Sequence, residues 1–270
     1  MSRHTLILAA LGPAGTISHA LAARLANEVR LLPTIGAVFE HVAAGKGDGL
    51  VPLENSEAGG VGPSLDALLT HQVFITAEIC VQVRFHLAAA VGMDAVTAVY
   101  AHPQAHEQSS RLVERLDVPV VHTSSNAASA EEAARVGGGA AALTTALAAE
   151  RCGLSLIARD VQDAPDNTTR FVQISKAPYT GEEATKCSLL LDPMTDRAGL
   201  LADLLTVFAR REINLTRIES RPARRGLGRY VFFIDGEAGP EWGRAVAELK
   251  NLVEVKEFGC YPHLEVSGWR

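Results

Sequence analysis

The fold class is set near the start of the chain by the segment TLILAALGPAGTIS, residues 5–18. Its apolar part, residues 5–11, reads as a β-strand, and its two glycines allow a sharp turn into a helix expected over residues 18–27. A strand that turns directly into a helix is the repeating unit of α/β sheets. The N–H groups at such a helix start favour an anion, but the pattern also fits an ordinary β–α turn capped by Ser18.

The same alternation of strand and helix continues to about residue 175. Further strands are expected at residues 49–53, 73–77, 81–91, 95–101, 118–122 and 140–144, and helices at residues 64–70, 104–116, 127–136 and 145–151. This order predicts parallel sheets joined by crossover helices. Ligands bind such sheets at the loops that follow the strands, so polar residues in these loops are candidate site residues.

The composition changes at residues 176–183, a polar stretch with proline and glycine that reads as a linker. Beyond it, strands are expected at residues 186–191, 213–221, 229–235 and 253–258, with helices at 199–211 and 241–251. The resulting order βαββαβ is that of a small ferredoxin-like unit. Such an open sheet has a free edge, which predicts pairing with a second copy of the chain.

Composition excludes several classes of protein. The chain has 270 residues, a hydrophobic content of 47% and a net charge of −6, which argues against broad binding to nucleic acid phosphates. The one dense basic run, residues 217–229, is interrupted by Glu219 and reads as a solvated strand and turn. No apolar segment approaches the roughly 20 residues that span a bilayer. Residues 6–11 form a strand rather than a signal-peptide core, and we expect a cytoplasmic protein.

The four cysteines, at positions 80, 152, 187 and 260, are widely spaced and form no Cys-x-x-Cys pair. This spacing indicates reduced thiols rather than a disulfide framework or a zinc site. The nine histidines show no His-Glu-x-x-His spacing, and Pro103 separates His102 from His106 on any helix. No Gly-x-Ser-x-Gly elbow occurs, which disfavours a serine hydrolase. We therefore expect no metal and no cofactor.

Three polar clusters follow apolar runs and are candidates for one pocket: residues 12–18, residues 52–56 and residues 167–171. In the last cluster, Arg170 could clamp a substrate carboxylate or form a surface salt bridge. In the second, Asn55 and Ser56 could donate to a carboxylate while Glu54 orients them, or they could simply form a turn. Together these groups suit a small anionic substrate that loses an oxygen.

Read together, these segments resemble the prephenate dehydratase family, which converts prephenate to phenylpyruvate. GPAGTIS at 12–18, DGLVPLENS at 48–56, HPQA at 102–105 and the block 141–171 ending in NTTRF are similar to the family's motifs in order. The resemblance implies two α/β lobes around a cleft, like type-2 periplasmic binding proteins. It places the catalytic domain at residues 1–178, with lobes at about 1–78 plus 159–178 and at 79–158.

The resemblance also implies roles for individual residues. Thr169 would donate to the departing hydroxyl, Arg170 would anchor a carboxylate, and Phe171 would pack near the ring or brace the loop. Asn55 and Ser56 would complete the catalytic set by hydrogen bonding, with Glu54 as an orienter. The other residues implied for substrate binding are Thr16, Ser18, Ser125 and Thr168.

The tail, residues 186–263, resembles the regulatory ACT domain, which implies an allosteric phenylalanine site between paired copies in a homodimer or homotetramer. The residues implied for that site are Gly199, Leu200, Leu201, Asn214, Leu215, Glu219, Ser220, Arg221 and Pro222. A plain dimerisation domain is the alternative reading of this tail.

Some positions depart from the family's pattern. Ile17 stands where an aromatic residue is usual, Asn126 where threonine is usual, and Leu200 where alanine is usual. The sequence leaves three rival functions open: arogenate dehydratase, a non-catalytic amino-acid sensor, and prephenate decarboxylase. The presence of Thr169 and Arg170 disfavours the non-catalytic sensor, because a pure sensor needs no leaving-group donor.

Overall fold

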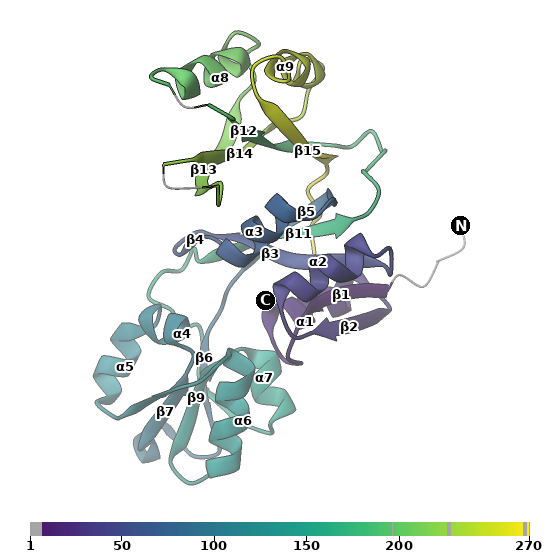
Figure 1. The fold of residues 1–270 in the computed structure, drawn as a ribbon. Helices are drawn as coiled ribbons and strands as arrows, with labels where there is room; N and C mark the ends of the chain where they lie inside the picture. Colours follow the sequence, from purple (N-terminus) through teal and green to yellow (C-terminus); the bar gives the residue numbers. More distant parts are fainter. Residues whose placement is uncertain (1–6, 196, 226–227, 267–268, 270) are drawn as a thin grey trace.

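The structure, a computed structural model, describes residues 7–195, 197–225, 228–266 and 269. These residues form three α/β units, each built on its own sheet (Figure 1). The first lobe lies in the middle, with the second lobe at one end and the C-terminal unit at the other. The expected α/β class and the βαββαβ tail are therefore confirmed, with two lobes preceding that tail.

The first lobe contains a sheet of order β2-β1-β3-β11-β5, with the short β4 paired to β3. Its strands are β1 (Ile7–Leu11), β2 (Glu28–Leu32), β3 (Asp48–Asn55), β4 (Gly59–Gly60), β5 (Phe74–Gln82) and β11 (Thr168–Ser175), and its helices are α1 (Ile17–Leu25), α2 (Ile35–Ala43) and α3 (Gly62–Thr70). Leu21 and Ala22 of α1 pack on one face of this sheet, whereas Val38 and Phe39 of α2 pack on the other. One face of the sheet is therefore covered by α1 and the other by α2.

The second lobe contains a sheet of order β10-β6-β9-β7-β8. Its strands are β6 (His86–Ala89), β7 (Ala98–Ala101), β8 (Val120–His122), β9 (Ala140–Thr144) and β10 (Ser155–Ala158), and its helices are α4 (Pro103–Glu107), α5 (Ser110–Leu116), α6 (Asn126–Val136) and α7 (Ala146–Arg151), with a 3₁₀ turn η1 (Met93–Ala95). Buried alanines such as Ala130, Ala142 and Ala148 line the contact of α6 and α7 with the sheet. Small side chains let these helices approach the strands closely.

Both sheets are mixed, which corrects the expectation of parallel sheets. In the first lobe β11 runs antiparallel to β3 and β5, and in the second lobe β6 runs antiparallel to β9 and β10. The cause is that the chain leaves the first lobe after β5 and returns to it as β11. The outward crossing is at residues 83–85, a few residues beyond the expected lobe boundary, because β5 continues to Gln82.

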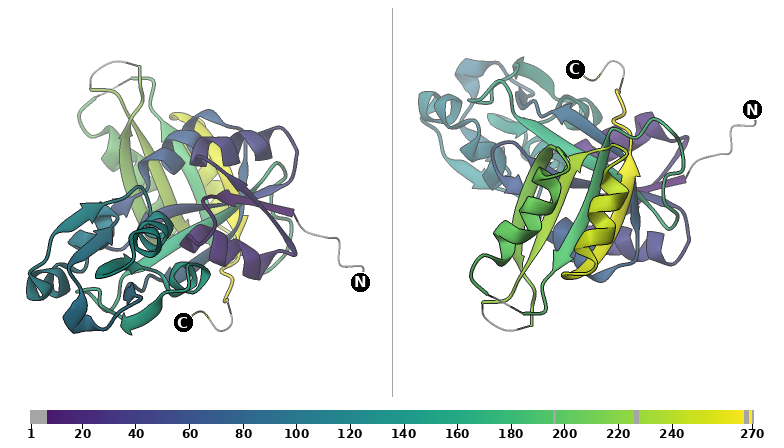
Figure 2. Two further views of the ribbon diagram at one scale, coloured as in Figure 1. Left: turned by 90° about the horizontal axis from the view of Figure 1, so that it is seen from below. Right: turned by 90° about the horizontal axis from the view of Figure 1, so that it is seen from above.

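The C-terminal unit has a sheet of order β13-β14-β12-β15. Its strands are β12 (Lys186–Asp192), β13 (Leu215–Pro222), β14 (Tyr230–Glu237) and β15 (Glu254–Tyr261), and its helices are α8 (Leu200–Ala209) and α9 (Trp242–Leu249). Both helices lie on the outer face of the sheet, which Figure 2 shows from above. The inner face joins the first lobe, since Phe233, Phe258 and Tyr261 belong to the same apolar cluster as Val38.

Some local predictions were wrong. The strand β2 and the helix α2 were not predicted. In β2, charged Glu28 and Arg30 alternate with apolar residues and no residue is fully buried, so the segment lacks the apolar run of a core strand. The expected break between strands at residues 77 and 81 is absent, because β5 is continuous across Glu78.

The cysteines also differ from the expectation of four reduced thiols. Cys187 of β12 and Cys260 of β15 are cross-strand partners and form a disulfide, whereas Cys80 and Cys152 are free. The two bonded cysteines are 73 positions apart, so their pairing depends on the sheet and could not be read from spacing.

The tail that follows β15 returns to the first lobe. His263 pairs with Glu78 of β5 in an isolated parallel β-bridge of the backbone. The backbone N–H of Leu264 donates to the carbonyl of Glu78. Trp269 donates from Nε1 to the carbonyl of Gln82 at 2.9 Å. None of the helices in the described ranges is long and apolar enough to cross a membrane.

Gly49 on β3 has no room for a larger side chain. A Cβ atom there would lie 2.7 Å from Cγ1 of Val38 and 2.9 Å from Cγ2 of Val42. We expect Gly49→Ala to lower the free energy of unfolding by about 1–3 kcal/mol, because the core must shift to accept the methyl group. Guanidinium denaturation measures this, with Gly92→Ala, where a Cβ meets no atom within 4 Å, as the control. Equal midpoints for the two variants would contradict the expectation.

Candidate active site

The cluster at residues 12–18 is a turn between β1 and α1 whose own side chains hold it in place. Thr16 caps α1, since its Oγ1 accepts from the backbone N–H of His19 at 3.2 Å and donates to the carbonyl of Pro13 at 3.0 Å. The cap is therefore Thr16 and not Ser18, which is buried in the first turn of the helix. The hydroxyl of Thr16 is already engaged within the turn.

Asn55 at the end of β3 and Thr169 near the start of β11 form the centre of the candidate site. They are cross-strand partners, and Nδ2 of Asn55 donates to Oγ1 of Thr169 at 3.0 Å. The amide cannot flip without loss, because its Oδ1 accepts from the backbone N–H groups of Glu57 and Ala58 at 3.1 and 3.0 Å. Asn55 thus makes Thr169 an acceptor and leaves the proton of the Thr169 hydroxyl available for another group.

This pair extends to the second lobe through two buried amides. Nδ2 of Asn55 also donates to Oδ1 of Asn167 at 2.7 Å, and Nδ2 of Asn167 donates to Oε1 of Gln108 at 2.8 Å. Gln108 ends α4 of the second lobe, so the chain of bonds joins both sides of the interlobe crossing. Sequence reasoning missed Gln108, because one glutamine in a predicted helix carries no local signal.

Ser56 and Thr168 fasten the two strands beside this pair. The N–H of Thr168 donates to Oγ of Ser56 at 3.0 Å, and the N–H of Ser56 donates to the carbonyl of Thr168 at 2.9 Å. Thr168 donates its own hydroxyl to the carbonyl of Asp166 at 3.1 Å. These contacts hold the loop ends at fixed register.

In the second lobe, Ser125 caps α6, with its Oγ accepting from the N–H of Ala128 at 3.0 Å. Thr145, which precedes α7, donates its hydroxyl to the carbonyl of Gly15 at 3.2 Å. A Cβ on Gly15 would lie 3.4 Å from Cβ of Ala127, so the turn after β1 packs directly against the helix starts of the other lobe. The departure at Asn126 lies at this contact, as the first residue of α6.

Arg170 was expected to bind a substrate carboxylate, but its side chain is directed at the C-terminal unit. Its side chain is buried, and it points from β11 toward the C-terminal unit, where Nη1 donates to Oδ2 of Asp235 at 2.5 Å and Nη2 donates to the hydroxyl of Tyr261 at 2.9 Å. Nε lies 2.7 Å from Oε2 of Glu78. Neither a surface salt bridge nor a free carboxylate clamp fits these contacts, since carboxylates of the protein already surround the guanidinium.

Glu54 faces the same side as Arg170. Its Oε2 lies 3.6 Å from Nη1 of Arg170 and 3.5 Å from Nε of Arg217 on β13. Phe171, by contrast, packs on the opposite face with Leu21 and Ile79. Arg217 is largely buried, so the basic run that begins there is not simply a solvated strand.

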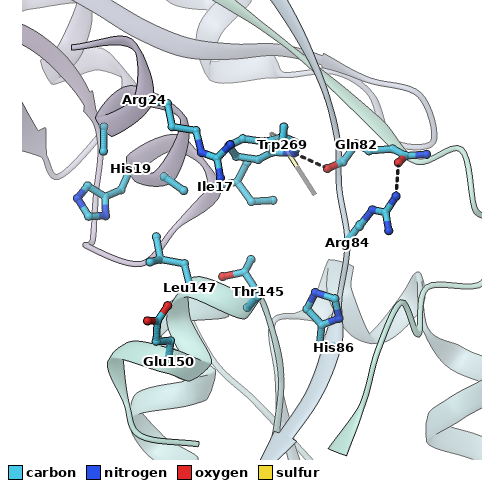
Figure 3. A pocket seen from close by; sticks show the side chains of 13 residues that line it. Ile17, His19, Arg24, Gln82, Arg84, His86, Thr145, Leu147, Glu150 and Trp269 are labelled. Carbon is cyan, nitrogen blue, oxygen red and sulfur yellow. Dashed lines mark hydrogen bonds between the residues drawn. The ribbon is translucent and has the colours of Figure 1, made fainter. Parts of the chain in front are cut away.

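A cavity of about 430 Å³ lies beside the crossing between the lobes (Figure 3). Arg24 and Ile17 of α1 line one side, Thr145 and Glu150 the other, and Arg84 of the outward crossing a third. Gln82 also lines it and is the cross-strand partner of Thr168, whereas Asn55 and Thr169 themselves do not line it. Burial lowers the pKa of His86 in its wall, which favours the neutral imidazole at pH 7.

The residues implied for an effector site fall in two places. Gly199, Leu200 and Leu201 line a cavity of about 210 Å³ together with Tyr230 and Phe232. Residues 214–222 line no part of this cavity within the single chain. Nη2 of Arg221, for example, lies 3.0 Å from Oδ1 of Asp66 in the first lobe.

Comparison with known proteins identifies the family. Residues 8–179 match the family model for prephenate dehydratase. The chain belongs to the prephenate dehydratase family. Residues 193–254 match the model for the ACT domain, so this family member carries an ACT unit at its C-terminus.

Individual relatives match almost the whole chain. The prephenate dehydratase of Mycolicibacterium smegmatis is 36% identical over 289 residues, which cover 97% of this chain and 92% of the relative. The prephenate dehydratase of Arthrobacter aurescens, solved in complex with L-Phe, has a TM-score of 0.85 and 31% identity, covering 95% of this chain and 90% of that one. A structure described as a quorum-quenching acylase, GqqA, has a TM-score of 0.85 and 28% identity, covering 96% and 98%. Because proteins with different described activities share this fold, the reaction of this dehydratase family member has to be argued from its site.

Asn55 provides a test of the site that leaves Thr169 in place. We expect Asn55→Asp to lower kcat about 10–100-fold, because the carboxylate accepts the Thr169 proton and turns that hydroxyl away from the substrate. Steady-state kinetics measures the change, with Ser64→Ala as a control, since Ser64 donates to the carbonyl of Pro52 on the same strand. A kcat equal to wild type in folded Asn55→Asp would contradict the orienting role.

Proposed function

We propose that the chain is a carbon–oxygen lyase that converts prephenate to phenylpyruvate in phenylalanine biosynthesis. The observation that carries the proposal is the Asn55–Thr169 pair, in which the threonine hydroxyl is left free to donate. Membership of the prephenate dehydratase family over residues 8–179 supports the choice of substrate.

Loss of CO₂ and the ring hydroxyl together makes the prephenate ring aromatic, so the driving force lies in the substrate. The protein has to fix the ring and stabilise the departing hydroxide, without binding the leaving carboxylate too tightly. A hydroxyl donor held by Asn55 meets the second need without a strong acid. Thr169 acts as this donor, and Asn55, Asn167 and Gln108 hold it in position across the lobes.

The other residues of the candidate site support its structure and take no direct part in the proposed reaction. Ser56 and Thr168 keep the loop ends in register. Thr16 and Ser18 shape the start of α1, and Ser125 shapes the start of α6, where the two lobes meet. Phe171 braces the strand from the α1 side of the sheet. Glu54 orients Arg170 and Arg217 on the opposite face.

Since Arg170 is occupied, the substrate carboxylates need other cations. Arg24 and Arg84 line the cavity beside the crossing, and we assign the carboxylate contact to this wall. Arg84 is partly exposed, with Nη1 3.2 Å from Oδ1 of Asp160 and Nη2 2.9 Å from Oε1 of Gln82. It can exchange these partners for a substrate at small cost.

This assignment predicts a defect in substrate binding. We expect Arg84→Gln to lower kcat/KM about 10–100-fold, mainly through KM, since a hydrogen bond to a charged group contributes about 1.5–3 kcal/mol. The matched control is Arg159→Gln, because Arg159 is an exposed arginine between β10 and β11 that does not line this cavity. Equal KM values for both variants would remove Arg84 from the substrate site.

Regulation and assembly follow from the ACT unit. We infer that L-phenylalanine is the effector and that it binds at the cavity of Gly199, Leu200 and Leu201, with Asn214, Leu215, Glu219, Ser220, Arg221 and Pro222 supplied across a dimer interface. The L-Phe complex of the Arthrobacter aurescens relative supports the ligand. The open edge of β13 and the half-exposed Ile218 on it support a homodimer or homotetramer.

The domain division is also proposed. Residues 1–178 make the catalytic domain and residues 186–263 the regulatory domain, which agrees in outline with the two family matches. We also propose a cytoplasmic location, which the free thiols of Cys80 and Cys152 favour and the Cys187–Cys260 disulfide does not.

The test compares kcat/KM on prephenate and on arogenate with purified protein. A preference for prephenate supports the proposal, and a preference for arogenate selects the arogenate dehydratase reading. Tight amino-acid binding without turnover of either substrate selects the non-catalytic sensor.

A further inference from the structure

A buried ion cluster joins the catalytic sheet to the ACT sheet. We define it as Glu78 of β5, Arg170 of β11, and Asp235, Ser188 and Tyr261 of the C-terminal unit. All five side chains are buried. Their charges come from different units of the fold, so the cluster exists only when the two sheets are docked.

Arg170 is the centre of the cluster. Its Nε lies 2.7 Å from Oε2 of Glu78 in its own lobe, and its Nη1 lies 2.5 Å from Oδ2 of Asp235 on β14. Arg170 also donates to the hydroxyl of Tyr261 at 2.9 Å. Burial lowers the pKa of Arg170, but Asp235, Tyr261 and Glu78 together raise it more, so Arg170 stays charged. Burial raises the pKa of Tyr261, so Tyr261 stays protonated.

Asp235 is itself fixed inside the ACT sheet. Oγ of Ser188 on β12 donates to Oδ1 of Asp235 at 2.5 Å, and Nη1 of Arg217 on β13 lies 3.7 Å from Oδ2. Ser188 and Arg217 are the cross-strand partners of Asp235 on either side. The carboxylate that holds Arg170 therefore moves with the centre of the ACT sheet.

The next residue along β11 is Thr169. Successive side chains of a strand point to opposite faces, and the core clusters confirm this here: Phe171 packs with α1, whereas Val172 packs with Phe233 of the ACT sheet. Thr169 thus faces the side of α1 and Asn55, while Arg170 faces Asp235. A guanidinium held by two hydrogen bonds and one further ion pair fixes the height and the rotation of the strand end that carries the Thr169 hydroxyl.

We propose that Arg170 is a positioning residue, through which Asp235 of the ACT sheet holds Thr169 in its productive orientation. The proposal rests on the proposed function, because it assigns the effect to the Thr169 donor. It gives Arg170 a role that requires no substrate contact. It also provides a contact path of two side chains from the regulatory sheet to the reacting group.

The experiment is a double-mutant cycle between Asp235→Asn and Thr169→Ala, with kcat and KM measured on prephenate. Asparagine keeps the size of the side chain and removes its charge. We expect Asp235→Asn alone to lower kcat about 10-fold or more with KM changed less than about twofold, since small misplacements of reacting groups are costly. In the Thr169→Ala background the same substitution should change kcat less than about twofold.

Two variants make the result interpretable. Glu257→Gln removes an ACT ion pair to Lys250 that does not touch Arg170 and should leave kcat unchanged. If Asp235→Asn does not fold, Tyr261→Phe takes its place in the cycle, because it removes one acceptor of Arg170 and keeps the ring in the core.

Coupled effects on kcat support the link. Effects of Asp235→Asn that persist in full without the Thr169 hydroxyl, or that appear only in KM, would overturn it. No turnover of prephenate by the wild type would instead remove the proposed function, and this is seen before any variant is compared.

Discussion

Replacing Thr169 with alanine is expected to lower kcat for prephenate about 10²–10⁴-fold, the usual contribution of one positioned proton donor. The hydroxyl is the donor that we propose, because Asn55 donates to its oxygen and leaves its proton available, and alanine removes it without adding bulk. The fold should survive, because the Thr169 side chain is only partly buried and its cross-strand partner remains. Steady-state kinetics on prephenate, with circular dichroism to confirm folding, measures the effect.

Thr169→Ser is the matched variant, since it keeps the hydroxyl and loses only the methyl group. We expect its kcat to lie within about 10-fold of wild type, because the donor remains but is less restricted in rotation. A serine variant as slow as the alanine variant would mean that the side chain acts through packing and not as a donor. Wild-type activity in folded Thr169→Ala would remove Thr169 from the chemistry.

Replacing Arg170 with methionine is expected to lower the free energy of unfolding by about 3–5 kcal/mol. The guanidinium lies between two buried carboxylates, and its removal leaves Asp235 without its nearest cation and Glu78 paired with Lys186, at 2.8 Å. Such a loss is a large part of the total stability of most domains. Guanidinium denaturation, followed by far-UV circular dichroism, measures the change.

The control is Arg135→Met, which removes an exposed pair on α6 between Arg135 and Glu132. Exposed pairs contribute about 0–1 kcal/mol, so this variant should unfold close to wild type. Equal midpoints for Arg170→Met and Arg135→Met would show that the buried cluster does not hold the sheets together.

Much of the fold followed from the sequence because its signals are local. The turn GPAGT after an apolar strand and the order of elements after residue 186 both predicted units that the structure contains. The strands that were missed or misjudged depend on distant partners. β11, for example, returns from the second lobe and lies between β3 and β5, a position that no local pattern specifies.

The candidate site was predictable in part for the same reason. Asn55 and Thr169 were singled out from polar clusters and from the resemblance, and the structure places them as neighbours. The carboxylate role first assigned to Arg170 does not fit, because the residues that surround it are at positions 78, 235 and 261, far apart in the sequence. Gln108 was missed because its partner, Asn167, lies 59 residues away.

The most direct measurement is the formation of phenylpyruvate from prephenate by the purified wild-type chain, with and without L-phenylalanine. We predict that phenylpyruvate forms and that the rate falls when L-phenylalanine is added. Absence of phenylpyruvate from a folded preparation would contradict the assignment of the Asn55–Thr169 pair to this reaction.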